Sequence, residues 1–501
     1  MSNIWARKSL ASILKQAADS EKGLKRTLGV WNLVALGIGA IIGAGLFVRT
    51  ASAAAQAAGP GVTLSFIVAA VGCALAGLCY AEFAASVPIS GSAYAYAYIT
   101  MGELVAWIIG WALIMEYALG AATVSIAWSE YLNKLLGGMI PYEWCHSPME
   151  SVIDASGITR HGVMNLPALV ILLALTLLLI RGTDKSATVN AVIVFLKVAI
   201  VLVFIAVGWQ FINPANYSPY FIPEGTRPVL DADGGVLISY DSIFKHGYGG
   251  ILGGAAIVFF AFIGFDAVST TAQEAKNPGR DMPIGIMGSL VVCTVLYILF
   301  GHVLTGVANW SEFADPAKGK EASVAYAISA HMPGYGWLAT LVTVAILAGF
   351  SSVILVMLLG QSRVFFSMAN DGLLPKVFSE VHPEYRTPYK SNWIVFAFVA
   401  AFAAFIPGHM AGDLTSFGTL LAFVLVCIGV LIMRKNLPDM ERPFRTPMPW
   451  LVAPLGALIC LGMIVAIDVF TLKVAVAWML LGLLIYFGYS QHHSNLNKDN
   501  Q

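Results

Sequence analysis

Charged residues are scarce in this chain. Lys, Arg, Asp and Glu make up only 11% of the 501 residues, whereas hydrophobic residues make up 58%. Soluble domains contain about 25% charged and about 45–50% apolar residues. The composition therefore excludes an ordinary soluble domain and indicates an integral membrane protein. The formal net charge is zero, which argues against a nucleic-acid partner.

Residues that could form a disulfide, a metal site or a catalytic site are also few and scattered. Of the six cysteines only Cys145 lies outside the apolar runs, so we expect no disulfide framework. Neither a metal-ligand spacing, nor a nucleophile, nor a nucleotide-binding signature appears. The first 30 residues hold no apolar segment before a small-residue cleavage site, so no signal peptide is expected. The sequence thus predicts no enzymatic activity, no cofactor and no resident metal.

Long apolar runs dominate what remains. About twenty apolar residues cross a bilayer of about 30 Å, and the chain offers about twelve such runs. They lie near residues 31–56, 61–87, 103–129, 164–180, 188–209, 248–273, 282–308, 337–369, 392–406, 413–433, 450–470 and 474–489.

The basic residues predict the orientation of these runs. With the N-terminus in the cytoplasm, 19 Lys and Arg fall on the inner side and 8 on the outer side, with Lys197 inside a run. The positive-inside rule therefore favours cytoplasmic N- and C-termini and an even number of spans.

Glycines interrupt two of the runs near their middles. The first carries "LGIGAIIGAGLF" (Leu36 to Phe47) and the sixth carries "GGILGGAAIVFFAFIGFDAVST" (Gly249 to Thr270), about 220 residues later. Interrupted spans at matching positions in two halves are typical of transporters built from inverted repeats. Small-residue packing between helices is an alternative reason for such glycines. A dinucleotide fingerprint is excluded because Ile42 stands where the third glycine would be.

Breaks of this kind expose backbone groups that bind charge. If the first span unwinds near Gly43 to Gly45, unpaired N–H groups begin a second half-helix and suit a carboxylate. A matching break from Phe260 to Gly264 would leave free carbonyls that suit an ammonium group. Together these two breaks fit the head group of an α-amino acid.

Three segments carry a resemblance to a known family: "GIGAIIGAGLF", "YAEFAASVPISGSAYAYAY" and "GFDAVSTTAQEAKNPGRDMPIGI". The chain resembles the amino acid–polyamine–organocation (APC) superfamily over nearly its whole length, and most closely bacterial relatives of the cationic amino acid transporters. The resemblance implies an all-α polytopic membrane protein with a leucine-transporter-type 5+5 inverted repeat and 12 transmembrane helices. It implies these divisions: a cytoplasmic segment 1–30, a first repeat 31–212, a second repeat 213–434, two further spans within 435–490 and a cytoplasmic tail 491–501.

The resemblance also implies a substrate site made largely of backbone. The substrate carboxylate would meet the chain around Gly43, Ala44 and Gly45. The amino group would meet the carbonyls of Ile41, Phe260, Ala261 and Ile263. Ala44 stands where many relatives carry Ser or Thr, so one hydroxyl contact is missing here.

Two charged residues inside spans have open roles. Lys197 is the only basic residue deep in a span, and the resemblance places its ammonium between the first and eighth spans, where sodium sits in sodium-coupled relatives. It either couples transport to protons or supports the structure as a strut. Glu116, midway along the third span, either pairs with a cationic substrate or is a structural acid bonded to a neighbouring helix.

Residues of the sixth span are further candidates. Asp266 follows the predicted break and is expected to cap or brace the second half-helix. Phe260, Phe262 and Phe265 are candidates for an aromatic gate, with simple packing as the alternative for each.

The sequence as a whole predicts a secondary active transporter of L-amino acids in a bacterial inner (cytoplasmic) membrane. Proton-coupled symport is the leading hypothesis, with broad specificity for neutral amino acids and with cationic amino acids as an open alternative. An amino acid exchanger is the nearest alternative, and a non-transporting amino acid sensor a more distant one. The expected partners are the amino acid, protons and membrane lipid; the sequence is compatible with a monomer but does not specify the oligomeric state.

Overall fold

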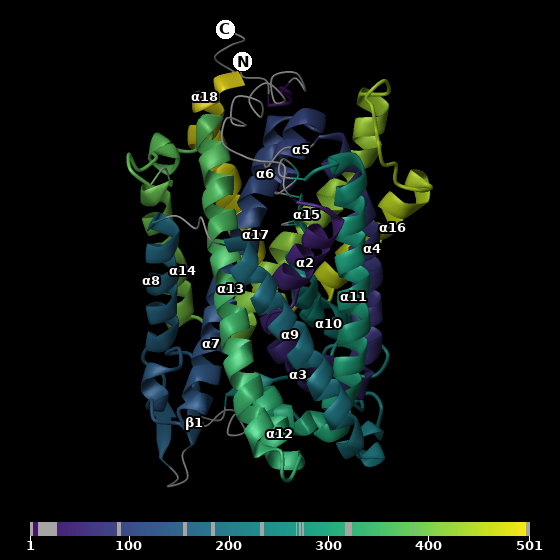
Figure 1. Ribbon diagram of the computed structural model, residues 1–501, viewed down its shortest axis with the longest axis vertical. Helices are drawn as coiled ribbons and strands as arrows, with labels where there is room; N and C mark the ends of the chain where they lie inside the picture. Colours follow the sequence, from purple (N-terminus) through teal and green to yellow (C-terminus); the bar gives the residue numbers. More distant parts are fainter. Residues whose placement is uncertain are drawn as a thin grey trace.

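Helices running side by side make up nearly all of the computed structural model (Figure 1). The structure describes residues 4–8, 28–87, 92–153, 158–181, 186–230, 235–266, 268–269, 272, 275–315, 323–385 and 387–496. Most of the predicted N-terminal segment and the end of the predicted tail lie outside these ranges. The α-helices are α2 (Val30–Ile41), α3 (Thr50–Ala53), α4 (Val62–Ser86), α5 (Ser92–Thr100), α6 (Glu103–Ile114), α7 (Gly120–Leu135), α8 (Leu166–Arg181), α9 (Ser186–Gly208), α10 (Gly249–Val258), α11 (Pro278–Val307), α12 (Ser323–His331), α13 (Gly336–Asn370), α14 (Tyr389–Phe405), α15 (Gly408–Asn436), α16 (Pro449–Val465), α17 (Val469–Ile485) and α18 (Gln491–His493).

Short segments of π- or 3₁₀-helix interrupt or extend these helices. The π segments are η1 (Gly45–Arg49), η2 (Ala54–Ala58), η4 (Met115–Leu119) and η14 (Tyr486–Ser490). The 3₁₀ segments are η3 (Gly59–Gly61), η5 (Tyr142–Trp144), η6 (Trp209–Phe211), η7 (Pro214–Tyr217), η8 (Phe259–Phe262), η10 (Trp310–Ala314) and η13 (Lys376–Ser379).

The helices have the length and composition of membrane spans. Among the described residues, seven helical stretches are long and apolar enough to cross a membrane, and five further apolar helices are shorter. Large apolar side chains point outward from the bundle, such as Phe195 on α9 and Leu484 on α17. A helix satisfies its own backbone hydrogen bonds, which lipid cannot do for it. The chain is therefore a helical, multi-pass membrane protein.

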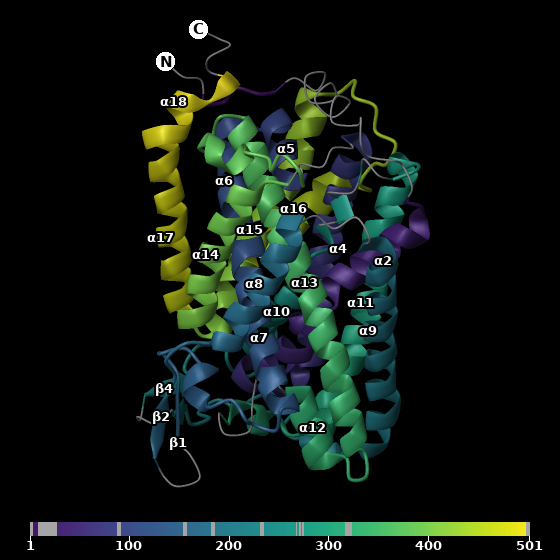
Figure 2. The same ribbon diagram turned by 60° about the vertical axis from the view of Figure 1, so that its left-hand side comes forward.

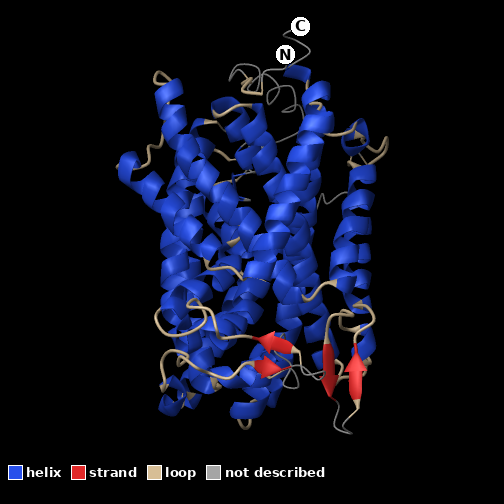
Figure 3. Cartoon of the chain, turned by 180° about the vertical axis from the view of Figure 1, so that it is seen from behind, coloured by secondary structure: helices blue, strands red, loops and turns tan. Residues whose placement is uncertain are grey.

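Two short β-hairpins lie at the end of the bundle that also carries α12 (Figures 2 and 3). Strand β1 (Ser151–Ile153) pairs antiparallel with β2 (Thr159–His161), and β3 (Val229–Leu230) pairs antiparallel with β4 (Val236–Ile238). The sequence predicted an all-helical protein, so these hairpins are a small correction. They fall in the long connections between spans, where water can satisfy the outer edge of a strand.

Both described ends of the chain meet at the opposite end of the bundle, near α18. The backbone N–H of Glu103 donates to the Ala6 carbonyl at 3.0 Å, and the Ser494 hydroxyl donates to the Glu103 carboxylate. The two ends therefore lie on one side, as an even number of crossings requires.

Candidate functional site

The first break follows directly after α2. The Ile42 N–H still donates to the Ile38 carbonyl at 2.9 Å, but Ile42 itself is extended, with φ −73° and ψ 104°. Helix resumes with η1 at Gly45, and no side chain of the described residues caps its start. The first N–H groups of a helix have no partner within the helix. The structure thus puts the break at Ile42 and Gly43, at the beginning of the predicted Gly43 to Gly45 stretch.

The second break follows α10. Regular helix ends at Val258, η8 continues as a tighter 3₁₀ turn to Phe262, and Ile263 is extended, with ψ 137°. Gly264 has φ 111°, a conformation that side chains rarely adopt. A Cβ atom there would also lie 2.9 Å from the Ala40 carbonyl oxygen. Glycine at this position is required both by the turn and by the approach of the first span.

The two breaks cross in contact. A Cβ atom on Gly45 would lie only 2.1 Å from the Cα of Ala261. Two backbones can come this close only where one residue lacks a side chain. The glycines therefore serve close packing at Gly45 as well as unwinding at Gly43, so both interpretations of the motif apply, at different positions.

Tyr297 of α11 joins the two breaks, and sequence reasoning missed it. Its hydroxyl lies 2.9 Å from the carbonyl oxygen of Ile41 and 2.9 Å from that of Ala261, and can donate its proton to one at a time. Both carbonyls were expected to receive a substrate amino group. A tyrosine within an apolar span looks like a packing residue, although its one polar atom needs a partner when buried.

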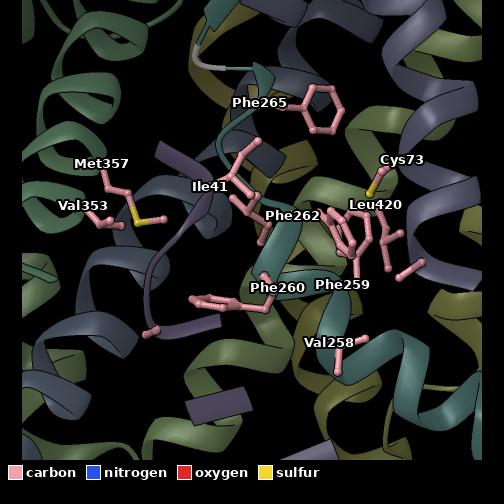
Figure 4. Packing of buried hydrophobic residues seen from close by; sticks show 14 of the residues in the cluster. Ile41, Cys73, Val258, Phe259, Phe260, Phe262, Phe265, Val353, Met357 and Leu420 are labelled. Atoms are coloured by element: carbon pink, nitrogen blue, oxygen red, sulfur yellow. The ribbon is translucent and has the colours of Figure 1, made fainter. Parts of the chain in front are cut away.

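Apolar side chains surround the crossing (Figure 4). Phe260 points to the side on which Val353 and Met357 of α13 lie. Phe262 instead packs against Tyr297, with ring centroids 5.3 Å apart, and Phe265 packs against Phe423 at 4.9 Å. Of the three candidate gate residues, only Phe260 lies toward the α13 side of the first break.

Lys197 of α9 reaches the first span. Its ammonium donates to the Gly39 carbonyl at 2.9 Å, and its side chain is buried. The stem packs on α13, because a Cβ atom on Gly349 would lie 2.8 Å from the lysine Cε. The structure thus places Lys197 between the first span and α13.

Glu116 and Asp266 come together, although they are 150 residues apart in the chain. Both are fully buried, and the Glu116 carboxyl faces Asp266 and the hydroxyl of Thr419. The Tyr117 hydroxyl donates to Asp266 Oδ2 at 2.8 Å. Asp266 therefore contacts the third span, and its predicted role as a brace of the second half-helix stays a prediction.

An ion pair lies on the α12 side of the crossing. The guanidinium of Arg49, in η1, donates to the Asp413 carboxylate of α15 and is almost fully buried. Lys245 lies near Asp413, and burial lowers the pKa of its ammonium. Sequence reasoning missed this cluster, since nothing local connects residues 364 positions apart.

A second ion pair lies on the other side, near the described ends of the chain. Arg434 of α15 donates to both carboxylate oxygens of Glu82 at 2.9 and 2.7 Å, and the Thr446 N–H adds a third bond. This arrangement fixes the end of α4 to α15. In the ranges that the structure describes, no group of three or more His, Cys, Asp or Glu is placed to hold a metal ion.

Comparisons with known proteins all match transport proteins, whose named substrates differ. The sequence pattern of the family described as amino acid permease matches residues 28–488. The chain is 42% identical over 498 residues to the branched-chain amino acid permease BcaP of Bacillus subtilis (strain 168), covering 99% of each. It is 40% identical over 500 residues to the methylthioribose transporter of the same organism, covering 99% of this chain and all of that one. It is 34% identical over 440 residues to the vacuolar cationic amino acid transporter 4 of Arabidopsis thaliana, covering 88% of this chain and 68% of that one.

Proposed function

Because this chain belongs to the amino acid permease family of the APC superfamily, we propose that it is a secondary active transporter that carries L-amino acids by proton symport. The family and its relatives identify a transport protein for amino acids and not an enzyme. The observation that carries the proposal is the contact between two broken helices at Gly45 and Ala261. Broken helices that meet in mid-membrane are a feature of transporter substrate sites.

The proposed site holds the amino acid by its head group. The carboxylate binds the N–H groups at the start of η1, around Gly43, Ala44 and Gly45, where the half-helix dipole is positive. The ammonium group binds carbonyls at the two breaks, with Ile41 and Ala261 foremost because their oxygens already converge on one hydroxyl. Phe260 and Ile263 supply the remaining carbonyls.

The proposed architecture has twelve spans. Residues 31–212 and 213–434 form two inverted repeats of the leucine-transporter type, and residues 435–490 add two spans. The position of a break in the first helix of each repeat supports this division. Both termini lie in the cytoplasm of a bacterium, as the distribution of basic residues favours.

We propose that the substrates are neutral and apolar, with branched-chain amino acids preferred. Three observations support this. Apolar side chains of Phe260, Val353 and Met357 lie beside the first break, and Glu116 is fully buried. A relative that is 42% identical over 498 residues is a branched-chain amino acid permease. The test is inhibition of labelled leucine uptake into proteoliposomes by isoleucine, valine, alanine, arginine, lysine and methylthioribose. Stronger inhibition by arginine than by isoleucine would refute a neutral, apolar preference. It would support a cationic substrate whose side chain pairs with Glu116.

Lys197 is the proposed proton-coupling residue. Its ammonium binds a carbonyl only two residues before the end of α2, so loss of its proton would weaken a charge-assisted hydrogen bond beside the first break. We expect Lys197→Ala to lose uptake driven by an imposed proton gradient but to keep leucine–leucine exchange. The control is Lys473→Ala, because Lys473 is an exposed lysine on α17. Unchanged gradient-driven uptake in Lys197→Ala would refute the role, and strict dependence of wild-type efflux on external amino acid would favour an exchanger.

A further inference from the structure

Glu116 lies in a local irregularity of the third span. The π segment η4 separates α6 from α7, and π turns within α-helices are rare and concentrate at functional sites. Consecutive residues of a regular helix point about 100° apart around its axis. Here Glu116 and Tyr117 both face Asp266, the first through its carboxyl and the second through a 2.8 Å hydrogen bond. The widened turn thus directs two neighbouring side chains onto one carboxylate of the sixth span.

The hydrogen bonding of Glu116 is incomplete. Neither of its carboxyl oxygens accepts a hydrogen bond from any described residue, although the side chain is fully buried. Buried polar atoms nearly always have a partner. The other buried glutamate of the same helix, Glu103, accepts bonds from Tyr98 at 2.8 Å, from Tyr486 at 3.0 Å and from Ser494. The Thr419 hydroxyl faces Glu116 but donates to the Thr415 carbonyl at 3.1 Å, so no described residue other than Asp266 can share a proton with the Glu116 carboxyl.

The groups around Glu116 provide no positive charge. Among the described titratable side chains, Asp266 and two phenols, Tyr80 of α4 and Tyr117 of η4, face Glu116. From α15 the facing group is the Thr419 hydroxyl. Over the described ranges, no Lys, Arg or His faces the Glu116 carboxyl. An ionised Glu116 against an ionised Asp266, inside a membrane and with no described cation facing Glu116, is strongly disfavoured.

We propose that Glu116 and Asp266 share one proton, which forms an acid–carboxylate hydrogen bond between the third and sixth spans. The acid of one residue donates, and a carboxylate oxygen of the other accepts. When this proton leaves to water, two negative charges face each other and the spans separate. Because Asp266 lies three residues after Ile263, the bridge joins the third span to the sixth span directly after the second break. Its role in transport rests on the function proposed above; the shared proton does not.

Infrared spectroscopy of the purified protein in lipid tests the shared proton directly. A protonated carboxylic acid has a C=O stretching band that a carboxylate lacks. We expect such a band in the wild type at neutral pH, and its loss in both Glu116→Gln and Asp266→Asn, because the introduced amide donates to the remaining carboxylate. Glu103→Gln is the matched control and should keep the band. Absence of the band in the wild type, or its loss in only one of the two variants, overturns the proposal.

Leucine–leucine exchange in proteoliposomes tests the bridge without a proton gradient. We expect wild-type exchange to change by up to about tenfold per pH unit where the pair loses its proton, and the two amide variants to give a nearly flat profile. Size-exclusion profiles and stabilisation by leucine establish that the variants are folded. Equal pH profiles in wild type and variants overturn the bridge. A failure of gradient-driven uptake with the expected infrared and exchange results refutes symport alone.

Discussion

Replacement of Gly45 by alanine tests the crossing of the two breaks most directly. The new Cβ atom would lie 2.1 Å from the Cα, 2.6 Å from the N and 2.7 Å from the Cβ of Ala261. Carbon atoms in contact need about 3.5–4.0 Å, so the two spans must separate by at least about 1.4 Å. Overpacking costs about 1–3 kcal/mol where side chains can yield, and here the obstacle is backbone. We expect the upper end of that range and a loss of the converging carbonyl geometry.

The assay compares leucine uptake and melting temperature of the reconstituted Gly45→Ala variant with the wild type. Gly288→Ala is the control, since its Cβ atom would meet only a side-chain carbon of Val34, at 3.2 Å. We expect Gly45→Ala to lose nearly all uptake and to melt earlier, while Gly288→Ala stays near the wild type. Wild-type uptake in Gly45→Ala would refute the close crossing and the site built on it.

Three further predictions follow from individual contacts. Tyr297→Phe removes a donor shared by two buried carbonyls, so the ligand-free variant should lose about 1–3 kcal/mol of stability. Added leucine should raise the melting temperature of the variant more than that of the wild type. Equal leucine-induced shifts in the two proteins would contradict this. Burial alone would lower the pKa of His146, but the Glu130 carboxylate, 2.7 Å away, raises it to about 9. The His146–Glu130 ion pair should therefore stabilise the folded protein fully below a pH of about 6.5. At most about 3 kcal/mol of the free energy of unfolding should be lost as the pH rises through about 9. The melting temperature of His146→Gln should lack this pH dependence. Asp413→Asn leaves the buried Arg49 without its counter-charge and should lower the free energy of unfolding by about 3–5 kcal/mol. The variant should therefore melt at a lower temperature, and the double variant with Arg49→Met should partly recover.

Hydropathy and glycine placement carried most of the fold prediction. Long apolar runs indicate spans because each must match the thickness of the membrane. The breaks near Gly43 and Gly264 were predictable since glycine lowers the cost of leaving a helix and tolerates positive φ. The hairpins were not, because strands of two or three residues are too short to show an alternating pattern.

The site was harder to predict because much of it depends on tertiary contacts. Lys197 and Glu116 stand out in a sequence as charges within apolar runs. Nothing local indicates that Glu116 faces Asp266, or that a π turn directs it there. The contact of the Tyr297 hydroxyl with both breaks likewise exists only once α11 packs against the first and sixth spans.

The Tyr297 hydroxyl has a consequence for the return half of the proposed transport cycle. A symporter has to return to its outward-facing state without substrate. In that step the carbonyl oxygens at the two breaks would lie in a low-dielectric interior without a hydrogen-bond donor. The Tyr297 hydroxyl lies within hydrogen-bond distance of the Ile41 and Ala261 carbonyl oxygens, and would replace the substrate ammonium group there after the substrate has left. In the symport proposed above, this contact would lower the barrier to reorientation without substrate and so favour net uptake over one-for-one exchange.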